Sequence, residues 1–189
     1  RIIDHRSSQN VDYFIANSEE TKRRIEKFYR KDATVIYPPV EIKNHESRIM
    51  NQGKRDFFLA GGRIARAKHT DLIVRAFVEN KLPLKVFGKG FAGFEEEIKD
   101  RIKNHESQLR QGFAGQAKIE FLGEVSDGEK DKLMAGAKAF ISASQDEDFG
   151  IVPVEAMMVG TPVIAHRSGG VLETVIEPSA SVRQAQDKS

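Results

Sequence analysis

Short hydrophobic runs alternate with longer amphipathic stretches from about residue 56 onward. Each run is about four or five residues long and ends in glycine, serine or a charged residue; the runs are residues 57–60, 84–87, 119–122, 139–143 and 162–165. Strands that helices cover on both faces have this continuous pattern, because no solvent-facing side remains to carry polar residues. The pattern therefore predicts five buried, parallel strands.

The stretches between these runs have helical spacing. In two of them hydrophobic residues recur on one face while charged residues fill the other, at Leu72, Ile73, Ala76 and Phe77 and at Phe94, Ile98, Ile102 and Leu109. A third helix is expected to begin at Asp127, and a fourth spans residues 152–159 and stops at Gly160. Regular strand–helix alternation predicts an α/β fold with a Rossmann-like, doubly wound, mostly parallel sheet.

The first part of the chain has a different pattern. Residues 11–16 and 34–37 predict short strands, and Ser18 can cap a helix between them. Residues 41–55 are polar and typical of a linker, and little beyond Pro178 can be buried. We therefore expect three parts: an interdomain segment or tail of a missing N-terminal domain over residues 1–45, the main domain over residues 46–178, and a frayed or truncated tail over residues 179–189.

Composition narrows the classes of function. The 189 residues are 39% hydrophobic and 31% charged, enough for one domain with a sizeable core. The absence of cysteine excludes disulfides and thiolate metal sites, and we expect a cytoplasmic protein. The net charge is +2, and Glu19, Glu20 and Glu26 dilute the basic residues between 22 and 31. A solvated helix face is favoured there over a nucleic-acid contact, and a peripheral membrane contact stays open.

The loop after the first run of the main domain has the composition of a phosphate site. Gly61 and Gly62 let the backbone approach a ligand closely, and the helix that follows directs free amides at it. Arg63 and Lys68 add two cations, which suit a diphosphate. The spacing matches neither a Walker loop nor a dinucleotide fingerprint. Basic residues are also common at strand ends without any ligand, so this loop alone leaves both interpretations open.

Two carboxylates, Glu147 and Glu155, flank the expected start of the fourth helix. If Gly150 begins that helix, Glu147 lies on the loop before it and Glu155 about one turn inside, so both can face one ligand. Pro153 in the first turn supports this start. A buried Glu155 needs a polar partner, which the hydroxyl groups of a ribose would provide.

The remaining loops give weaker indications. We interpret residues 88–90 as a structural turn, and Asp127 either stabilises a helix N-terminus or accepts hydrogen bonds from a nucleobase. Asp146 and Asp148 around Glu147 have the spacing of an Asp-x-Asp metal site, but no histidine cluster supports one, and we expect no metal. His166 fits a ligand contact or a surface turn equally well.

Residues 147–155 resemble the Glu-x7-Glu signature of the retaining family 4 glycosyltransferases, including its Phe-Gly-Ile core. The resemblance covers roughly residues 12–177 and includes Gly62-Arg63 with Lys68, and Gly169-Gly170 with Glu173. It implies the C-terminal, donor-binding half of a GT-B fold. One departure is His69, because the family usually has a glycine soon after its phosphate-binding lysine.

The resemblance also implies roles for individual residues. The catalytic set would be Glu147, near the donor sugar, with the diphosphate-binding cations Arg63 and Lys68. The sugar and phosphate contacts would come from Gly62, Phe149, Gly150 and Ile151, the ribose contact from Glu155, and the nucleobase contacts from Val125, Asp127 and Lys130. No metal and no further cofactor are implied. A GDP-sugar is favoured over a UDP-sugar, because the Asp127 carboxylate suits the paired N–H donors of guanine.

These features lead to three functional hypotheses. The first is a retaining hexosyltransferase, with mannose favoured, that transfers sugar to a glycan or lipid-linked acceptor and has its acceptor-binding domain outside this chain. Such a chain would bind donor but turn over poorly alone. The second is a sugar-nucleotide epimerase of related fold, and the third is a non-catalytic module that binds nucleotide sugars. No nucleic-acid partner is expected.

Overall fold

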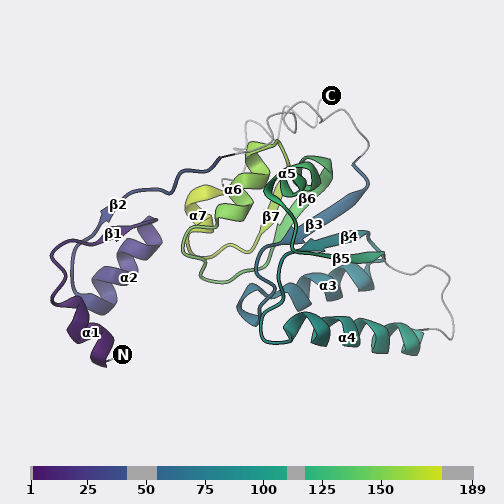
Figure 1. Cartoon of the computed structure of the whole chain (residues 1–189), viewed down its shortest axis with the longest axis horizontal. Coiled ribbons are helices and arrows are strands. Elements are labelled where there is room, and N and C mark those ends of the chain that lie inside the picture. The colour runs from purple at the N-terminus through teal and green to yellow at the C-terminus, as the bar shows by residue number, and fades with distance from the viewer. Residues whose placement is uncertain (1, 42–54, 110–117, 176–189) are drawn as a thin grey trace.

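The computed structural model describes residues 2–41, 55–109 and 118–175. The expected linker over residues 41–55, apart from its two end residues, and the expected tail over residues 179–189 lie outside this part of the chain. The described residues form a small N-terminal unit, residues 2–41, followed by a five-stranded sheet with helices on both faces (Figure 1).

The sheet is parallel throughout. Its strands are β3 (Phe57–Gly61), β4 (Leu84–Phe87), β5 (Ile119–Gly123), β6 (Ala137–Ser142) and β7 (Val163–Ala165), in the order β5-β4-β3-β6-β7. All five predicted strands are confirmed. The order runs outward from β3 in both directions, as in a doubly wound sheet, so the strand order reverses beside β3. Ligands of such sheets bind at the carboxyl ends of the strands around that reversal.

Helices cover both faces of the sheet (Figure 1). One face carries α3 (Thr70–Glu79) and α4 (Phe94–Leu109), and the other carries α5 (Asp127–Gly136) and α6 (Ile151–Met158). All four predicted helices are present: α5 begins at Asp127 as predicted, and α6 differs by one residue at each end from the predicted 152–159. Among the described residues, none of the helices has both the length and the apolar character that crossing a bilayer requires.

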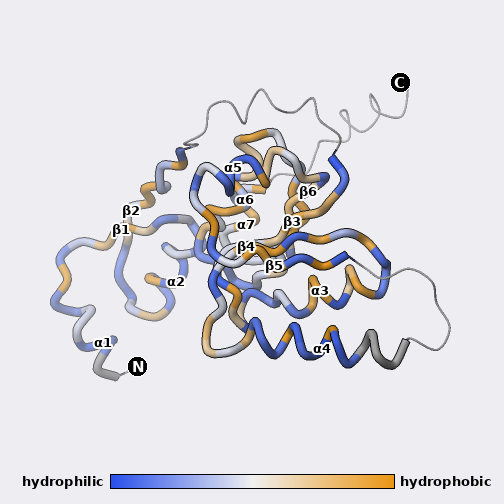
Figure 2. The backbone as a smooth tube through the Cα atoms, turned by 45° about the vertical axis from the view of Figure 1, so that its right-hand side comes forward, coloured by the Kyte–Doolittle hydropathy of each residue, from blue (hydrophilic) through white to orange (hydrophobic). Residues whose placement is uncertain are grey.

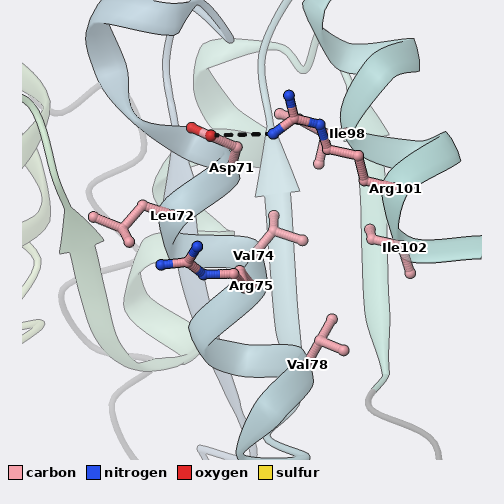
Figure 3. Close-up of a pocket in the computed structure, with 8 residues that line it drawn as sticks. All are labelled: Asp71, Leu72, Val74, Arg75, Val78, Ile98, Arg101 and Ile102. Atoms are coloured by element: carbon pink, nitrogen blue, oxygen red, sulfur yellow. Dashed lines mark ion pairs between the residues drawn. The ribbon is translucent and has the colours of Figure 1, made fainter. Parts of the chain in front are cut away.

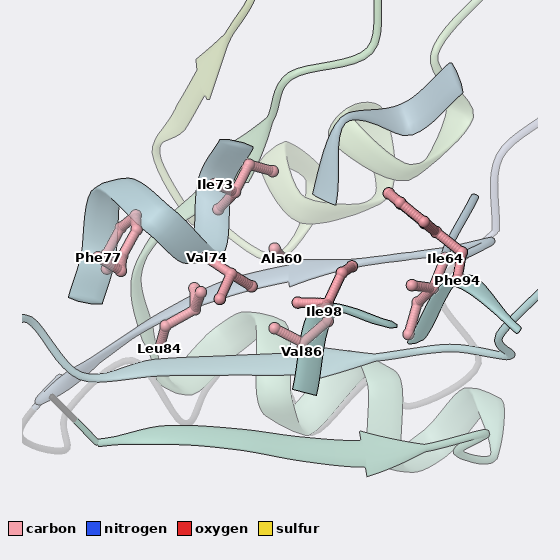
Figure 4. Close-up of a cluster of buried hydrophobic side chains, with 9 residues drawn as sticks. All are labelled: Ala60, Ile64, Ile73, Val74, Phe77, Leu84, Val86, Phe94 and Ile98. Carbon is pink, nitrogen blue, oxygen red and sulfur yellow. The ribbon is translucent and has the colours of Figure 1, made fainter. Parts of the chain in front are cut away.

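The alternation of side chains along each strand divides the core into two hydrophobic clusters. Leu59 packs with Met134 and Phe140 on the side of α5 and α6, whereas the next residue, Ala60, packs with Val74 on the side of α3 and α4. Figure 4 shows the second cluster between β3, β4 and the two helices. Along α4, hydrophobic positions recur within a largely hydrophilic helix, as an amphipathic surface helix requires (Figure 2).

The N-terminal unit consists of α1 (Ile2–Ser8), β1 (Ile15–Ala16), α2 (Glu19–Tyr29) and β2 (Thr34–Val35). Ser18 caps α2 as predicted, because its side chain accepts a hydrogen bond from the amide of Thr21. The two strands pair in parallel with each other but are shorter than the predicted 11–16 and 34–37. The difference has a physical reason: Val11 and Tyr13 are 38% and 89% exposed, so burial does not extend the first strand toward residue 11.

Candidate active site

A hollow of about 320 Å³ lies at the carboxyl ends of β3 and β6, beside the start of α6. We call it the main pocket. It is lined by six of the residues predicted from the sequence: Gly62, Arg63, Lys68, Glu147, Gly150 and Ile151. The parallel strands β3 and β6 are neighbours, and for that reason two loops far apart in the sequence meet at one edge of the sheet.

The backbone of the loop after β3, which carries Arg63, is held in place by the loop after β4. Gly62 has a φ of 108°, a conformation that favours glycine. A Cβ atom on Gly88 would overlap the carbonyl oxygen of Gly62, and the Ile64 amide donates a hydrogen bond of 3.0 Å to the Lys89 carbonyl. The turn at residues 88–90 therefore has the structural role that we expected, because it holds the loop that carries Arg63.

The lysine of this loop is followed by a left-handed residue. Lys68 ends the short helix η2 (Arg66–Lys68), and His69 has φ 50° and ψ 37°. This conformation explains why a glycine is usual here in the family that the sequence resembles. Histidine reaches it more readily than β-branched residues do, so the turn is retained without the glycine.

Lys68 and Glu147 are in direct contact in the lining of the main pocket. The Lys68 Nζ atom donates a hydrogen bond to the Glu147 carboxylate in an ion pair. Arg63 is exposed at the same pocket, and within the described residues no hydrogen bond or ion pair involves it. The pocket thus presents one neutralised cation, one free cation and one carboxylate to a ligand.

The second predicted carboxylate, Glu155, lies at the predicted position near the start of α6. Gly150, with a φ of 84°, precedes the first residue of α6, so Glu147 lies on the preceding loop and Glu155 about one turn inside the helix. The first amides of a helix have no partner within it and carry a positive dipole end. The start of α6 therefore adds an anion-attracting element to the main pocket.

A second hollow of about 310 Å³ shares Ile151 with the main pocket, and we call it the adjoining hollow. Glu155, Asp127 and Lys130 line it, together with Pro39 to Glu41 of the N-terminal unit. The Lys130 Nζ atom is 2.8 Å from Glu155 Oε1 and 3.5 Å from Asp127 Oδ1. Burial opposes the charge on Lys130, yet its pKa is raised, because hydrogen bonds and attraction from these two carboxylates outweigh the burial.

The N-terminus of α5 is capped by residues other than Asp127. The Ser126 hydroxyl accepts from the Glu129 amide, and the Glu129 carboxylate accepts from the Ser126 amide, which makes a complete capping box. The pattern Ser-x-x-Glu over residues 126–129 is a signal from which this cap could have been predicted. The cap leaves Asp127 in the first turn of α5, where its charge suits the helix N-terminus, and its carboxylate also lines the adjoining hollow, so both roles predicted for Asp127 fit the structure.

Two of the predicted residues lie outside both hollows. Val125 packs against the hydrophobic cluster beneath α5 and α6. Phe149 is 8% exposed, and its ring centroid lies 6.0 Å from that of Tyr37 in the N-terminal unit. Neither side chain lines the main pocket or the adjoining hollow, so any contact of Phe149 with a ligand would come from its backbone.

The sequence did not predict the role of Arg24, which contacts the loop that carries Glu147. Arg24 belongs to the basic stretch that we assigned to a solvated helix face, but it donates hydrogen bonds to the side chain of Asp148 and the carbonyl of Asp146. Its partners lie 124 and 122 positions away in the chain, and no periodic pattern connects such distant residues.

A third hollow, of about 180 Å³, lies between α3 and α4 (Figure 3). Its charged groups already have partners, since Arg101 is 3.7 Å from Asp71 and 2.6 Å from Glu97, and Arg75 is 3.8 Å from Glu79. None of the predicted site residues lines it. Across the part of the chain that the structure describes, no three His, Asp or Glu side chains are grouped as metal ligands would be.

The sequence is similar to those of known glycosyltransferases. The alpha-1,3/1,6-mannosyltransferase ALG2 of Mus musculus is 27% identical over 193 residues, covering 92% of this chain and 46% of that protein. An uncharacterized glycosyltransferase of Methanocaldococcus jannaschii is 29% identical over 173 residues, covering 90% of this chain and 44% of that protein. This chain thus spans about half the length of these relatives.

Solved structures show the same fold. Sucrose-phosphate synthase from Thermosynechococcus elongatus superposes with a TM-score of 0.73 at 22% identity, covering 93% of this chain and 45% of that one. Alr3699/HepE of Anabaena, in complex with UDP and glucose, gives 0.69 at 21% identity and covers 90% of this chain and 48% of that one. The family described as Glycosyl transferases group 1 matches residues 41–182, well over half of the chain. The chain therefore belongs to the glycosyl transferases of group 1.

Proposed function

We propose that this chain is the donor-binding half of a retaining hexosyltransferase that moves mannose from a nucleoside-diphosphate sugar to a glycan or lipid-linked acceptor. The observation that carries the proposal is that Arg63, Lys68 and Glu147 line one pocket, which adjoins the hollow of Glu155. The relatives named as mannosyltransferases support the choice of sugar.

The charges of the main pocket suit the chemistry of the donor. When the bond between the anomeric carbon and the diphosphate breaks, negative charge develops on the departing diphosphate. Arg63, Lys68 and the N-terminus of α6 are arranged to stabilise that charge. In this proposal they replace a divalent cation. Glu147 lies at the sugar end, where a carboxylate stabilises the positive charge that develops on the ring.

The adjoining hollow suits the nucleoside. The carboxylate of Glu155 can accept hydrogen bonds from the ribose hydroxyl groups, and Lys130 holds it in place at 2.8 Å. Asp127 can accept from the paired N–H donors of guanine, which favours GDP over UDP. Calorimetric titration of the chain with GDP and with UDP tests this preference, and tighter binding of UDP would reverse it. UDP is the appropriate nucleotide to compare with GDP, because the Anabaena structure of the same fold contains UDP.

The acceptor-binding half of the enzyme is the partner that we propose for this chain. Without it the chain would bind donor but transfer sugar poorly. A lipid-linked acceptor would bring the joined enzyme to the cytoplasmic surface of a membrane, where it would be peripheral. Joining this chain to its acceptor-binding half should restore transfer, whereas full activity of the chain alone would contradict the proposal.

Substitutions in the complete enzyme test the assigned roles. Glu147→Ala should lower the transfer rate by about two to three orders of magnitude, as does removal of a group that stabilises transition-state charge. Arg63→Ala should mainly weaken diphosphate binding. Arg75→Ala, on the outer side of α3, is a matched control and should leave both quantities unchanged. Wild-type rates and affinities in the first two variants would contradict the roles.

Analysis of the products separates this proposal from the other two hypotheses. Interconversion of the nucleotide sugar without any acceptor would indicate an epimerase. Binding of the nucleotide sugar without transfer by the complete protein would indicate a non-catalytic module, and failure to bind nucleoside diphosphates at millimolar concentration would contradict all three hypotheses.

A further inference from the structure

The loop that carries Glu147 is held on one side by the turn at residues 168–170. The Asp146 amide donates to the Ser168 hydroxyl at 3.0 Å, and the Gly170 amide donates to the Glu147 carbonyl at 2.7 Å. A Cβ atom on Gly169 would overlap the backbone of Glu147. This close approach therefore requires glycine.

The same loop is held on its other side by α2 of the N-terminal unit. Arg24 Nη1 donates to the Asp148 carboxylate at 2.5 Å, and Arg24 Nη2 donates to the Asp146 carbonyl at 2.7 Å. The Ser18 hydroxyl adds a 2.5 Å hydrogen bond to the Asp148 carbonyl. Both neighbours of Glu147 are thus bound by one guanidinium group, whose fork can hold two acceptors in a fixed geometry.

The helix that carries Arg24 is itself fixed to the main domain. The carboxylate of Glu173 accepts hydrogen bonds of 2.9 Å from the amides of Glu19 and Glu20 at the start of α2. Glu173 belongs to α7 (Val171–Thr174), which directly follows the glycine turn. The contacts therefore form a closed circuit from α2 to the loop, on to the turn and α7, and back to α2.

The backbone of the loop needs such restraint. Asp146 has a φ of 52°, in the left-handed region that costs a non-glycine residue free energy. A residue persists there only when its surroundings determine its conformation. The bonds of Arg24 and Ser168 to Asp146 are two of these determinants.

We propose that Arg24 is a positioning residue, which holds the Glu147 carboxylate against the main pocket by bridging Asp146 and Asp148. The role of Glu147 beside the donor sugar rests on the proposed function. Arg24 does not line the pocket, so its loss should affect the sugar end of the donor and spare the diphosphate.

Substitutions on α2 provide a matched test in this chain. Arg24→Gln removes the charge, and Arg24→Lys keeps the charge but loses the two-pronged geometry. Arg23→Gln is the control, because Arg23 is the preceding residue, bonds Glu20 at 2.8 Å and points its 59% exposed side chain elsewhere. Asp148→Asn removes the ion pair at one end of the bridge and leaves the bond from Arg24 to the Asp146 carbonyl, so it should give a smaller effect than Arg24→Gln.

Two measurements read out the loop and the site separately. Amide hydrogen exchange of residues 145–150 should be about tenfold faster in Arg24→Gln, intermediate in Arg24→Lys and unchanged in Arg23→Gln. Calorimetry should show about a tenfold loss of affinity for GDP-mannose in Arg24→Gln, with no loss of affinity for GDP, because a displaced Glu147 carboxylate can only free Lys68 for the diphosphate. The double variant Arg24→Gln with Asp148→Asn should be no worse than Arg24→Gln alone, because the contact between the two side chains is already absent in that variant.

Each contrary result has a different meaning. Equal exchange in Arg24→Gln and Arg23→Gln would overturn the proposed bridge. Faster exchange with equal losses for GDP-mannose and GDP would overturn the positioning role, because the effect would then extend to the whole pocket. Failure of the wild-type chain to bind either ligand would contradict the proposed function, and with it the role given to Glu147.

Discussion

Lys68 and Glu147 lie 79 positions apart in the sequence and form an ion pair in the lining of the main pocket. Lys68 ends the η2 helix after β3, and Glu147 belongs to the loop after β6. They meet because β3 and β6 are adjacent and parallel, so that their carboxyl ends lie at the same edge. A diphosphate that binds Lys68 must share it with this carboxylate or displace it.

Neutralising Glu147 should therefore strengthen the binding of a nucleoside diphosphate. A partly exposed ion pair contributes at most about 1 kcal/mol, so Glu147→Gln should raise the affinity for GDP by up to about fivefold. Arg63→Gln should act in the opposite direction, because it removes the free cation. Calorimetry on the two variants measures both effects, and weaker GDP binding by Glu147→Gln would show that the carboxylate assists the diphosphate.

Gly88→Ala should disrupt the phosphate loop from a distance. The new methyl group would overlap the carbonyl oxygen of Gly62, and the φ of 124° at Gly88 is itself unfavourable for alanine. We expect lower stability and weaker nucleotide binding. Gly128→Ala in α5 is the control: no atom lies within 4 Å of the new methyl group, and alanine favours the helix. Gly88→Ala should therefore have a lower melting temperature and a weaker affinity for GDP than Gly128→Ala, as measured by thermal unfolding and by titration.

The left-handed conformation of His69 predicts an unusual order of stabilities. His69→Gly should change the free energy of unfolding by less than about 1 kcal/mol, because relief of strain and the added entropy of the unfolded chain oppose each other. His69→Val should lower it by about 1 to 2 kcal/mol, because β-branched residues avoid positive φ. Chemical denaturation measures both. Equal stability of the two variants would indicate that the turn adjusts in solution.

The capping box of α5 predicts a dependence of stability on pH. Hydrogen bonds from the Ser126 hydroxyl and amide lower the pKa of Glu129 below its usual value. A lowered pKa in the folded state means that the contribution is complete above the unfolded pKa of about 4.3 and is lost as the pH falls through the folded pKa. The free energy of unfolding of the wild type should exceed that of Glu129→Gln, and this difference should shrink on acidification from about pH 6 to about pH 3. An advantage independent of pH would contradict the assignment.

Transfer by the complete enzyme should not depend on a divalent cation. In the proposed mechanism Arg63, Lys68 and the start of α6 stabilise the diphosphate, and the carboxylate of Asp148 is bound by Arg24. The transfer rate should be the same with a chelator and with added Mg²⁺. Activity that is lost with the chelator and restored by Mg²⁺ would contradict this part of the proposal.

Much of the main domain could be predicted from local patterns. The runs that became β3 to β7 were readable because strands buried on both faces lose polar alternation, and Gly150 marked the start of α6. The strands predicted for the N-terminal unit were too long, because hydrophobic residues such as Tyr13 are exposed there instead of buried. Val125 was assigned to the nucleobase contacts from resemblance alone, and its side chain packs outside the adjoining hollow, so a base contact by Val125 stays a prediction for its backbone.

The sequence by itself determined the succession of strands and helices along the chain, the glycines that permit close backbone approach, and the types of charge on each loop. These features depend on neighbouring residues and on periodicity, which a single chain displays directly. Only the tertiary structure decided that Lys68 pairs with Glu147 and that Arg24 bonds the residues on either side of Glu147. Such contacts depend on which strands become neighbours and how α2 packs against a loop more than a hundred positions away, and no local pattern records that choice.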